Sequence, residues 1–139
     1  MSFSLSMGKR LHYFRTLRNM TQKQLGMAIG FSERTADVRI SQYETDIRTP
    51  KKETAVCLAN ILNVFPAALS IPKVEDETTL LHLLFSLEDK LSEVSEEEKR
   101  TVLNALLDWQ QMMKKQKSGQ ITKAEYDEWR YHYPDGISF

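Results

Sequence analysis

Between residues 33 and 42 the sequence is rich in side chains that form paired hydrogen bonds. An arginine such as Arg34 or Arg39 can form two hydrogen bonds to the edge of a guanine, and Gln42 can do the same with an adenine. Each such pair provides roughly 1–3 kcal/mol of discrimination between bases. The polar side chains that we expect on one exposed surface here are Glu33, Arg34, Thr35, Asp37, Arg39, Ser41 and Gln42. Any one of them is equally well explained as a solvated surface group, so the cluster carries more weight than its members.

Three further cations could contact the phosphates of a nucleic acid, namely Lys23, Arg48 and Lys51. Phosphate contacts fix the position of a protein on a duplex without reading its sequence. Residues 1–72 contain 10 Lys+Arg and 5 Asp+Glu (net +5), and residues 73–139 contain 9 and 14 (net −5). A basic half suits a polyanionic partner, and an acidic half suits contact with protein or solvent. This imbalance alone supports nucleic-acid binding only weakly.

Helices must position these side chains, and the spacing of apolar residues predicts several short ones in the first half. Leu11, Phe14 and Leu17 recur at helical spacing and predict a helix over residues 8–18. Thr21 is a typical N-cap for a second helix over residues 22–29, and Gly30 a typical C-cap. With Ser32 as the next N-cap, a third helix is expected over residues 33–44, with Val38, Ile40 and Tyr43 as its apolar positions. A fourth follows Pro50, its apolar positions being Val56, Leu58, Ala59, Ile61 and Leu62, and residues 66–69 add one more turn.

The second and third helices are expected to cross at a steep angle through a tight turn. Gly30 tolerates the positive φ that such a turn needs. Gly26 and Ala28 are small enough to let the two helices approach closely. The third helix can then stand clear of the core with its polar face outward, as a helix that enters the major groove must.

This ordered set of features resembles the Cro/CI (Xre-type) helix-turn-helix family of phage repressors and bacterial regulators. The resemblance spans residues 8–69 and is carried by Thr21-Gln22-x-x-Leu25, the turn glycine Gly30, Ile40-Ser41-x-x-Glu44 and Pro50. It implies an all-α protein with an N-terminal five-helix lambda-repressor-like helix-turn-helix domain, followed by a small C-terminal helical region. It also implies sequence-specific binding to double-stranded DNA, with the helix from Glu33 to Glu44 in the major groove.

The resemblance assigns roles to individual residues. Gln22 occupies the position of the family glutamine that contacts the DNA backbone and braces the recognition helix, and Thr21 and Lys23 beside it could reach the same phosphates. Arg15 matches the family arginine that forms a structural ion pair with the motif glutamate, here Glu44. The alternative is that these two residues are independent surface charges.

Two departures from the family pattern affect the site. Ten residues lie between Gly30 and Ser41, four more than is usual. They add either one turn to the recognition helix or a longer loop before it. The extra turn is the simpler interpretation because it keeps Ile40 and Glu44 on the same side of the helix as in the family pattern. Asp46 replaces a common glycine and can adopt the same left-handed conformation.

The register of the base-contacting residues depends on which alternative holds. Counting back from Ser41 selects Asp37, Arg39, Ser41 and Gln42 as base contacts. Counting forward from Ser32 selects Arg34 and Thr35 instead.

The second half is also predicted to be helical. Leucines between residues 80 and 91 form one amphipathic segment, and Ser95 with Glu98 forms a capping box for a helix reaching residue 117. Thr122 with Glu125 forms another, opening a short helix that ends before Pro134. We therefore expect a DNA-binding domain over residues 1–72, a linker over residues 73–78 and an interaction region over residues 79–139. These helices carry more apolar surface than a small domain can hide, which predicts a homodimer; a sensor for an unidentified small-molecule or protein effector is the competing interpretation.

No residues suggest catalysis, a cofactor or a metal site. His12, His82 and His132 are far apart in sequence, and Cys57, the single cysteine, fits a core position in the fourth helix. No apolar run reaches the roughly 20 residues of a membrane span, and no secretory signal is visible. We expect a cytoplasmic, non-enzymatic transcription regulator, and the family resemblance favours a repressor over an activator. The alternative is an antitoxin-like or other protein-interaction module whose helix-turn-helix serves partner binding or autoregulation.

Overall fold

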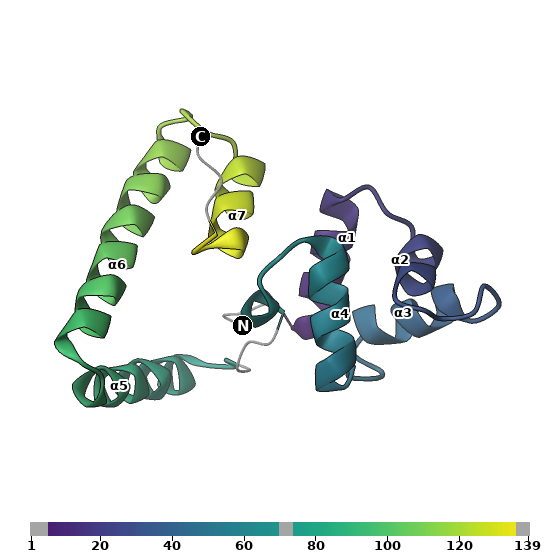
Figure 1. The fold of residues 1–139 in the computed structure, drawn as a ribbon, viewed down its shortest axis with the longest axis horizontal. Helices are drawn as coiled ribbons and strands as arrows, with labels where there is room; N and C mark the ends of the chain where they lie inside the picture. Colours follow the sequence, from purple (N-terminus) through teal and green to yellow (C-terminus); the bar gives the residue numbers. More distant parts are fainter. Residues whose placement is uncertain (1–5, 70–73, 136–139) are drawn as a thin grey trace. The chain divides into compact units, whose positions relative to one another are not determined.

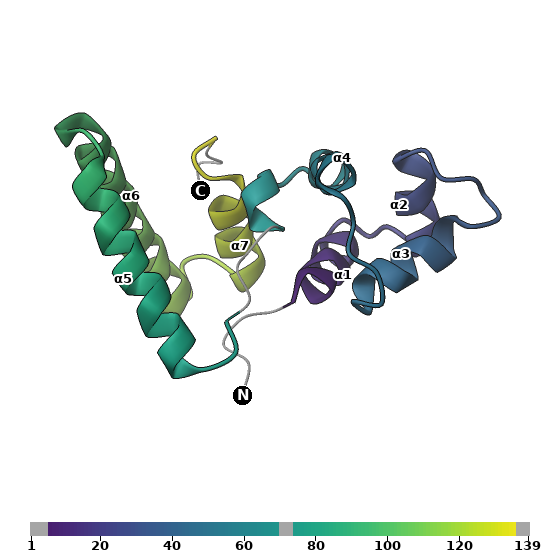
Figure 2. The same cartoon turned by 90° about the horizontal axis from the view of Figure 1, so that it is seen from below.

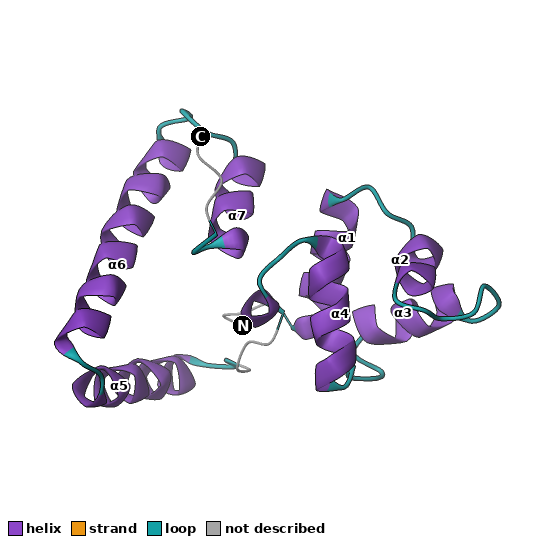
Figure 3. Ribbon diagram, viewed as in Figure 1, coloured by secondary structure: helices purple, strands orange, loops and turns teal. Residues whose placement is uncertain are grey.

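The computed structural model describes residues 6–69 and 74–135, and the chain divides into two compact units near residue 73. The N-terminal unit comprises residues 4–73, and the C-terminal unit contains residues 74–139. Within the described residues every regular element is a helix, which confirms the all-α prediction (Figure 3). Each unit is described below by itself.

The N-terminal unit contains four α-helices and one turn of 3₁₀ helix (Figure 1). They are α1 (Met7–Leu17), α2 (Gln22–Ala28), α3 (Ala36–Glu44), α4 (Lys52–Leu62) and η1 (Pro66–Ala68). The fully buried core residues come from all these helices or their ends and include Leu11, Phe14, Leu25, Ala36, Ile40, Leu58, Leu62 and Leu69. Side chains three and four residues apart in each helix therefore meet in one shared core, as the helical spacing predicts.

The helix ends follow from local hydrogen bonding. The Thr21 hydroxyl accepts from the Gln24 N–H and the Gln24 side chain accepts from the Thr21 N–H, so the predicted N-cap of α2 is a full capping box. Gly30 ends α2 with φ +99°, its N–H donating to Met27 while the Phe31 N–H donates to the Gly26 carbonyl. These two bonds form a Schellman motif, which confirms the predicted turn glycine.

The crossing of α2 and α3 depends on Gly26, which is buried. A Cβ atom at this position would lie 2.6 Å from the Ala36 carbonyl oxygen and 2.8 Å from the Ala36 Cβ. The two helices therefore approach more closely than any residue other than glycine allows. Ala28, the other small residue predicted to serve this approach, is exposed and plays no such part.

The third helix is shorter than the sequence predicted. It begins at Ala36 and not at Glu33, and Ser32 is not its N-cap. Instead, the N–H groups of Thr35 and Ala36 donate to the Ser32 carbonyl, and the Ser32 and Thr35 hydroxyls bond to each other at 3.0 Å. The four extra residues thus lengthen the connection before the recognition helix, which is the alternative to an extra helical turn.

Several predicted buried positions are exposed. Val38 is 53% exposed on the outer side of α3, and the α4 residues Val56 and Ile61 are 37% and 40% exposed. Cys57 is exposed and so does not belong to the core. Apolar character alone misplaced these residues because α3 and α4 each bury only one face.

The C-terminal unit consists of α5 (Glu77–Glu93), α6 (Glu96–Lys117) and α7 (Lys123–His132). Residues 77 and 78, predicted as linker, are the first of α5, whose N-cap is Asp76. The capping boxes at Ser95 and Thr122 are both present, as predicted. Helices α6 and α7 pack side by side (Figures 1 and 2) around a small core of Met112, Ile121 and Tyr126, flanked by Met113 and Trp129.

Helix α5 buries no residue, although it has five large apolar side chains that are 37–52% exposed. Helix α6 adds five more at 38–59% exposure. We call these ten side chains the apolar face of α5 and α6: Leu81, Leu84, Phe85, Leu87, Leu91, Val102, Leu103, Leu106, Leu107 and Trp109. Exposed apolar side chains in this number are typical of a protein-interaction site.

Among the described residues no helix is both long and apolar enough to cross a lipid bilayer.

Gly26→Ala tests the close approach of α2 and α3. We expect it to lower the free energy of unfolding by about 1–3 kcal/mol, because the obstructing atoms belong to the Ala36 backbone and Cβ and cannot move aside. Urea unfolding monitored by circular dichroism measures the change. Met27→Ala, on the exposed side of the same helix, is the control and should change stability little. Equal stability of Gly26→Ala and the unmodified protein would contradict the role of this glycine.

Candidate nucleic-acid interface

The carboxylate of Glu44, at the end of α3, is the polar centre of the N-terminal unit. It accepts hydrogen bonds from the Arg15 guanidinium and from Gln22 Nε2, the latter at 2.9 Å. It also lies 3.1 Å from His12 Nδ1. The Glu44 side chain is only 5% exposed and that of Arg15 only 11%. Arg15 also donates to the Met20 carbonyl at 2.7 Å. The predicted ion pair between Arg15 and Glu44 is therefore present, and these residues are not independent surface charges.

Burial by itself would raise the pKa of Glu44, because a buried carboxylate is poorly solvated. Hydrogen bonds from Arg15, Gln22 and His12 and the charge of Arg15 outweigh this effect and bring the pKa below its ordinary value of about 4.5. Glu44 is therefore ionised in the folded protein at neutral pH, and its charge is paired. One carboxylate links α1, α2 and α3, so it fixes the orientation of α3 relative to the two helices beneath it.

Asp46 forms a second link between α1 and the end of α3. It has φ +59°, which confirms that it adopts the left-handed conformation in place of the family glycine. Its carboxylate accepts the Gly8 N–H at 3.0 Å, a donor in the first turn of α1 that has no partner within that helix. Aspartate thus adds a hydrogen bond that a glycine could not make.

With its inner side fixed, α3 presents its other side outward. Asp37, Val38 and Arg39 are exposed, and Ser41 and Gln42 are partly exposed. This is the set obtained by counting back from Ser41. Val38 also lies on this outer face, although the sequence analysis assigned it to the apolar positions of the helix. Its position two residues from both Ala36 and Ile40, which are buried, places it on the opposite side of a helix, and this signal could have identified it. An exposed aliphatic group on such a helix can contact the methyl group of thymine.

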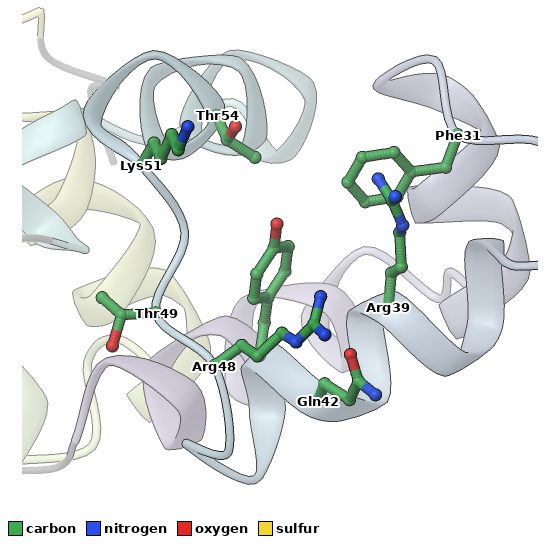
Figure 4. A pocket seen from close by; sticks show the side chains of 8 residues that line it. Phe31, Arg39, Gln42, Arg48, Thr49, Lys51 and Thr54 are labelled. Carbon is green, nitrogen blue, oxygen red and sulfur yellow. The ribbon is translucent and has the colours of Figure 1, made fainter.

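A hollow of about 540 Å³ lies beside the outer face of α3 (Figure 4). Its lining residues are Phe31, Arg39, Gln42, Tyr43, Arg48, Thr49, Lys51 and Thr54. Three of them are cations and none is acidic, so the hollow favours an anion. It is shaped by the end of α2, the outer face of α3, the loop after α3 and the start of α4.

Arg39 is held in this hollow by an aromatic ring. Its guanidinium carbon lies 4.6 Å from the centre of the Phe31 ring, and Phe31 in turn lies 6.3 Å from the Tyr43 ring. Figure 4 shows the guanidinium of Arg39 against Phe31, near Gln42 and Arg48. A stacked guanidinium keeps its planar edge free for hydrogen bonds, so Phe31 limits the directions in which Arg39 can point.

The other predicted contact residues lie around this surface and not on α3. Arg34 and Thr35 lie in the lengthened connection before α3, so they do not share the outer face of the helix. Lys23 Nζ lies 2.9 Å from the Glu33 carboxylate in an exposed ion pair. The Thr21 hydroxyl is used as the cap of α2, and Gln22 braces Glu44 as predicted. Contact of any of these residues with DNA stays a prediction.

No group of three or more potential metal ligands occurs within residues 6–69 and 74–135.

The sequence of this chain is similar to those of known proteins. Residues 11–67 match the sequence profile of the helix-turn-helix family. The matched residues include α2, α3 and the turn between them. A solved crystal structure, that of the transcriptional regulator BswR, is 35% identical in sequence; the alignment covers 73% of this chain and 92% of that one, with a TM-score of 0.48. A search of curated proteins gave no significant match. The chain belongs to the Cro/CI-type helix-turn-helix family.

The network around Glu44 predicts a pH-dependent stability. Glu44→Gln should lower the free energy of unfolding at pH 7 by about 2–4 kcal/mol, because it leaves the nearly buried guanidinium of Arg15 without its counter-charge. Because the pKa of Glu44 is lower in the folded state, its ionised carboxylate stabilises the fold at pH values above the pKa of the same group in the unfolded chain. This stabilisation is lost as the pH falls through the folded-state pKa. The difference between the variant and the unmodified protein should therefore shrink below about pH 4.5.

Urea unfolding at several pH values between neutral and acidic measures this difference. Glu33→Gln is the matched control, since it removes the same charge from an exposed ion pair and should leave stability unchanged at every pH. A stability difference for Glu44→Gln that stays constant across the acidic range would contradict the assignment of an ionised, paired Glu44.

Proposed function

We propose that the protein is a sequence-specific DNA-binding transcription regulator that places α3 in the major groove. The observation that carries this proposal is the two-sided character of α3. Its inner side is fixed by the buried Glu44 network, and its outer side presents Arg39 and Gln42 at the edge of a cationic hollow. Membership of the helix-turn-helix family supports it, as does the sequence similarity to BswR, a transcriptional regulator.

In this proposal the residues divide into two functional groups. Arg39, Gln42 and Val38 on α3 read base edges, Arg39 preferring guanine, Gln42 adenine and Val38 the methyl group of thymine. Arg48 and Lys51, in the connection to α4, bind phosphates on either side of the groove and fix the register. Glu33 neutralises Lys23, so Lys23 contributes less than an unpaired cation would.

The regulator acts as a homodimer and as a repressor in the same proposal. One recognition helix reads only a few base pairs, and a two-fold dimer that reads half-sites about 34 Å apart multiplies the contacts. The apolar face of α5 and α6 provides the surface for association. Repression requires no more than occupation of a promoter, whereas activation requires an additional contact with the transcription machinery.

The proposal is tested by binding of the purified protein to fragments of DNA from around its own gene, at several salt concentrations. Tight binding to one fragment, weakened steeply by salt and competed poorly by random DNA, is the expected result. Weak binding that is equal on all fragments would overturn the proposal and favour a protein-interaction module of the antitoxin type, or a regulator that requires an effector.

Two substitutions separate base reading from phosphate binding on the fragment that binds. Arg39→Ala should remove about 1–3 kcal/mol of preference at one base pair, and Phe31→Leu should reproduce part of this loss by removing the ring that orients Arg39. Lys51→Ala should weaken binding to all sequences alike and reduce the slope of log K against log salt by about 0.9. Titrations of single-base variants of the fragment give both quantities. If Arg39→Ala weakens all sequences equally, then Arg39 binds phosphate and the assigned register is wrong.

A further inference from the structure

The C-terminal unit contains an apolar groove that its own chain leaves open. The groove lies between α6 and α7 and has a volume of about 360 Å³. Its principal walls are Val102, Leu106 and Trp109 from α6, and Trp129, Arg130 and Tyr133 from α7 and its end. Trp109 is held in place by the hydrogen bond from its indole N–H to the Tyr126 hydroxyl at 2.8 Å. The groove is therefore a formed surface with fixed aromatic walls.

Helix α5 has an apolar seam whose residue spacing matches that of the apolar residues along α6. Leu80, Leu84, Leu87 and Leu91 follow one another at intervals of four, three and four residues. On α6, Val102, Leu106, Trp109 and Met113 follow one another at the same intervals. Alternating intervals of three and four residues are the pattern with which two helices interlock, and each seam runs for about 16 Å.

Within one chain these two seams do not meet. Helix α5 turns away from α6 at Val94 and Ser95 (Figure 1), and no residue of α5 is buried. Helices of this length that bury nothing are marginally stable in water, so α5 requires a partner. Folding α5 back onto its own α6 would cover one seam on each helix and leave Leu81 and Leu103 exposed.

The amount of apolar surface fits a second copy of the chain. A large aliphatic side chain presents about 100 Å² of apolar surface when fully exposed, so ten that are about half exposed present roughly 500 Å². A standard interface buries about 800 Å² on each partner, and homodimer interfaces are about 65% apolar. The apolar face of α5 and α6 thus matches what one half of a stable homodimer requires.

Charge also favours α5 as the occupant. Helix α5 contains Glu77, Glu88, Asp89 and Glu93 against the single cation Lys90. Arg130 is the one charged residue among those that line the groove, and its guanidinium also forms an ion pair with Asp127 at 2.8 Å. Because Asp127 already offsets part of this charge, Arg130 adds only a modest attraction for an acidic helix, and the apolar seam provides most of the complementarity.

We propose that α5 of a second copy occupies the groove between α6 and α7, and that the exchange is reciprocal. The dimer is then held by two identical contacts, each formed by a leucine seam and an aromatic groove. This inference rests on the proposed homodimer and specifies how it is built. It places both tryptophans of the chain, Trp109 and Trp129, at the contact.

The two tryptophans make the contact measurable in the unmodified full chain. Sedimentation velocity gives the mass, and tryptophan emission reports exposure of the groove, over one dilution series. We expect the emission to shift to longer wavelength over the concentration range in which the dimer dissociates. If the dimer dissociates without a change in tryptophan emission, the groove contact is refuted, while the proposed homodimer is retained. A monomer at all concentrations would refute the homodimer itself, and a constant short-wavelength emission in that monomer would indicate a groove filled by its own α5 or by a small apolar ligand.

Leu84→Asp tests the seam, and Ser86→Asp, on the opposite side of α5, is its matched control. Leu84→Asp should weaken dimerisation by at least about a hundredfold, because a reciprocal contact contains the new carboxylate twice. Ser86→Asp should leave dimerisation unchanged. Because α5 buries no residue, neither substitution should disturb the packing of the other helices of its own chain, which a urea unfolding transition followed by circular dichroism verifies. Equal effects of the two substitutions would overturn the seam.

Leu106→Asp places the charge in the groove and should also prevent dimerisation. An equimolar mixture of Leu84→Asp and Leu106→Asp chains should associate more tightly than either variant alone, because the mixed dimer retains one intact seam in one intact groove. If Leu106→Asp alone remains as dimeric as the unmodified protein, α5 pairs with α5 and not with the groove, and the proposal fails.

Discussion

The N-terminal unit depends on the ion pair between Arg15 and Glu44. A carboxylate is a costly group to bury, and this one is stable because Arg15, Gln22 and His12 all converge on it. The same bonds that offset burial also tie α3 to α1 and α2, so the solvation requirement of one side chain determines the orientation of α3. Gly26 and Asp46 complete this arrangement, the first by permitting contact between backbones and the second by bonding the start of α1. The position of the outer face of α3 is therefore set mainly by the residues on its inner side.

Features that depend on local hydrogen bonding were predictable from the sequence. Thr21, Ser95 and Thr122 are N-caps, and Gly30 has the expected positive φ, since each requires only residues three or four positions away. The Arg15–Glu44 pair, 29 positions apart, was implied by the family resemblance and not by composition or periodicity. The sequence also indicated which helices exist, because the spacing of leucines and other apolar residues is a strong signal over ten or more positions.

The start of α3 and the exposure of its side chains were not predictable in the same way. Ser32 has the chemistry of an N-cap, but its carbonyl and hydroxyl are engaged by Thr35 and Ala36, and the helix begins only where Ala36 can pack against Gly26. A tertiary contact thus overrode a local signal. Val38 and Cys57 were misplaced for a related reason, because the periodicity of a short helix does not reveal which side faces the core. The hollow beside α3 combines residues from four segments, and only the fold brings Phe31 against Arg39.

The lack of buried residues in α5 also bears on how such a protein can diverge in evolution. Substitutions in most helices are constrained because they affect the stability of the chain that contains them. In α5 an apolar side chain can be exchanged, enlarged or charged without disturbing any internal packing. After gene duplication, two copies could therefore acquire incompatible seams and cease to recognise each other, while their DNA-reading surfaces stay intact. In the proposed dimer, partner choice and DNA sequence preference are therefore assigned to separate helices, and each can change without the other.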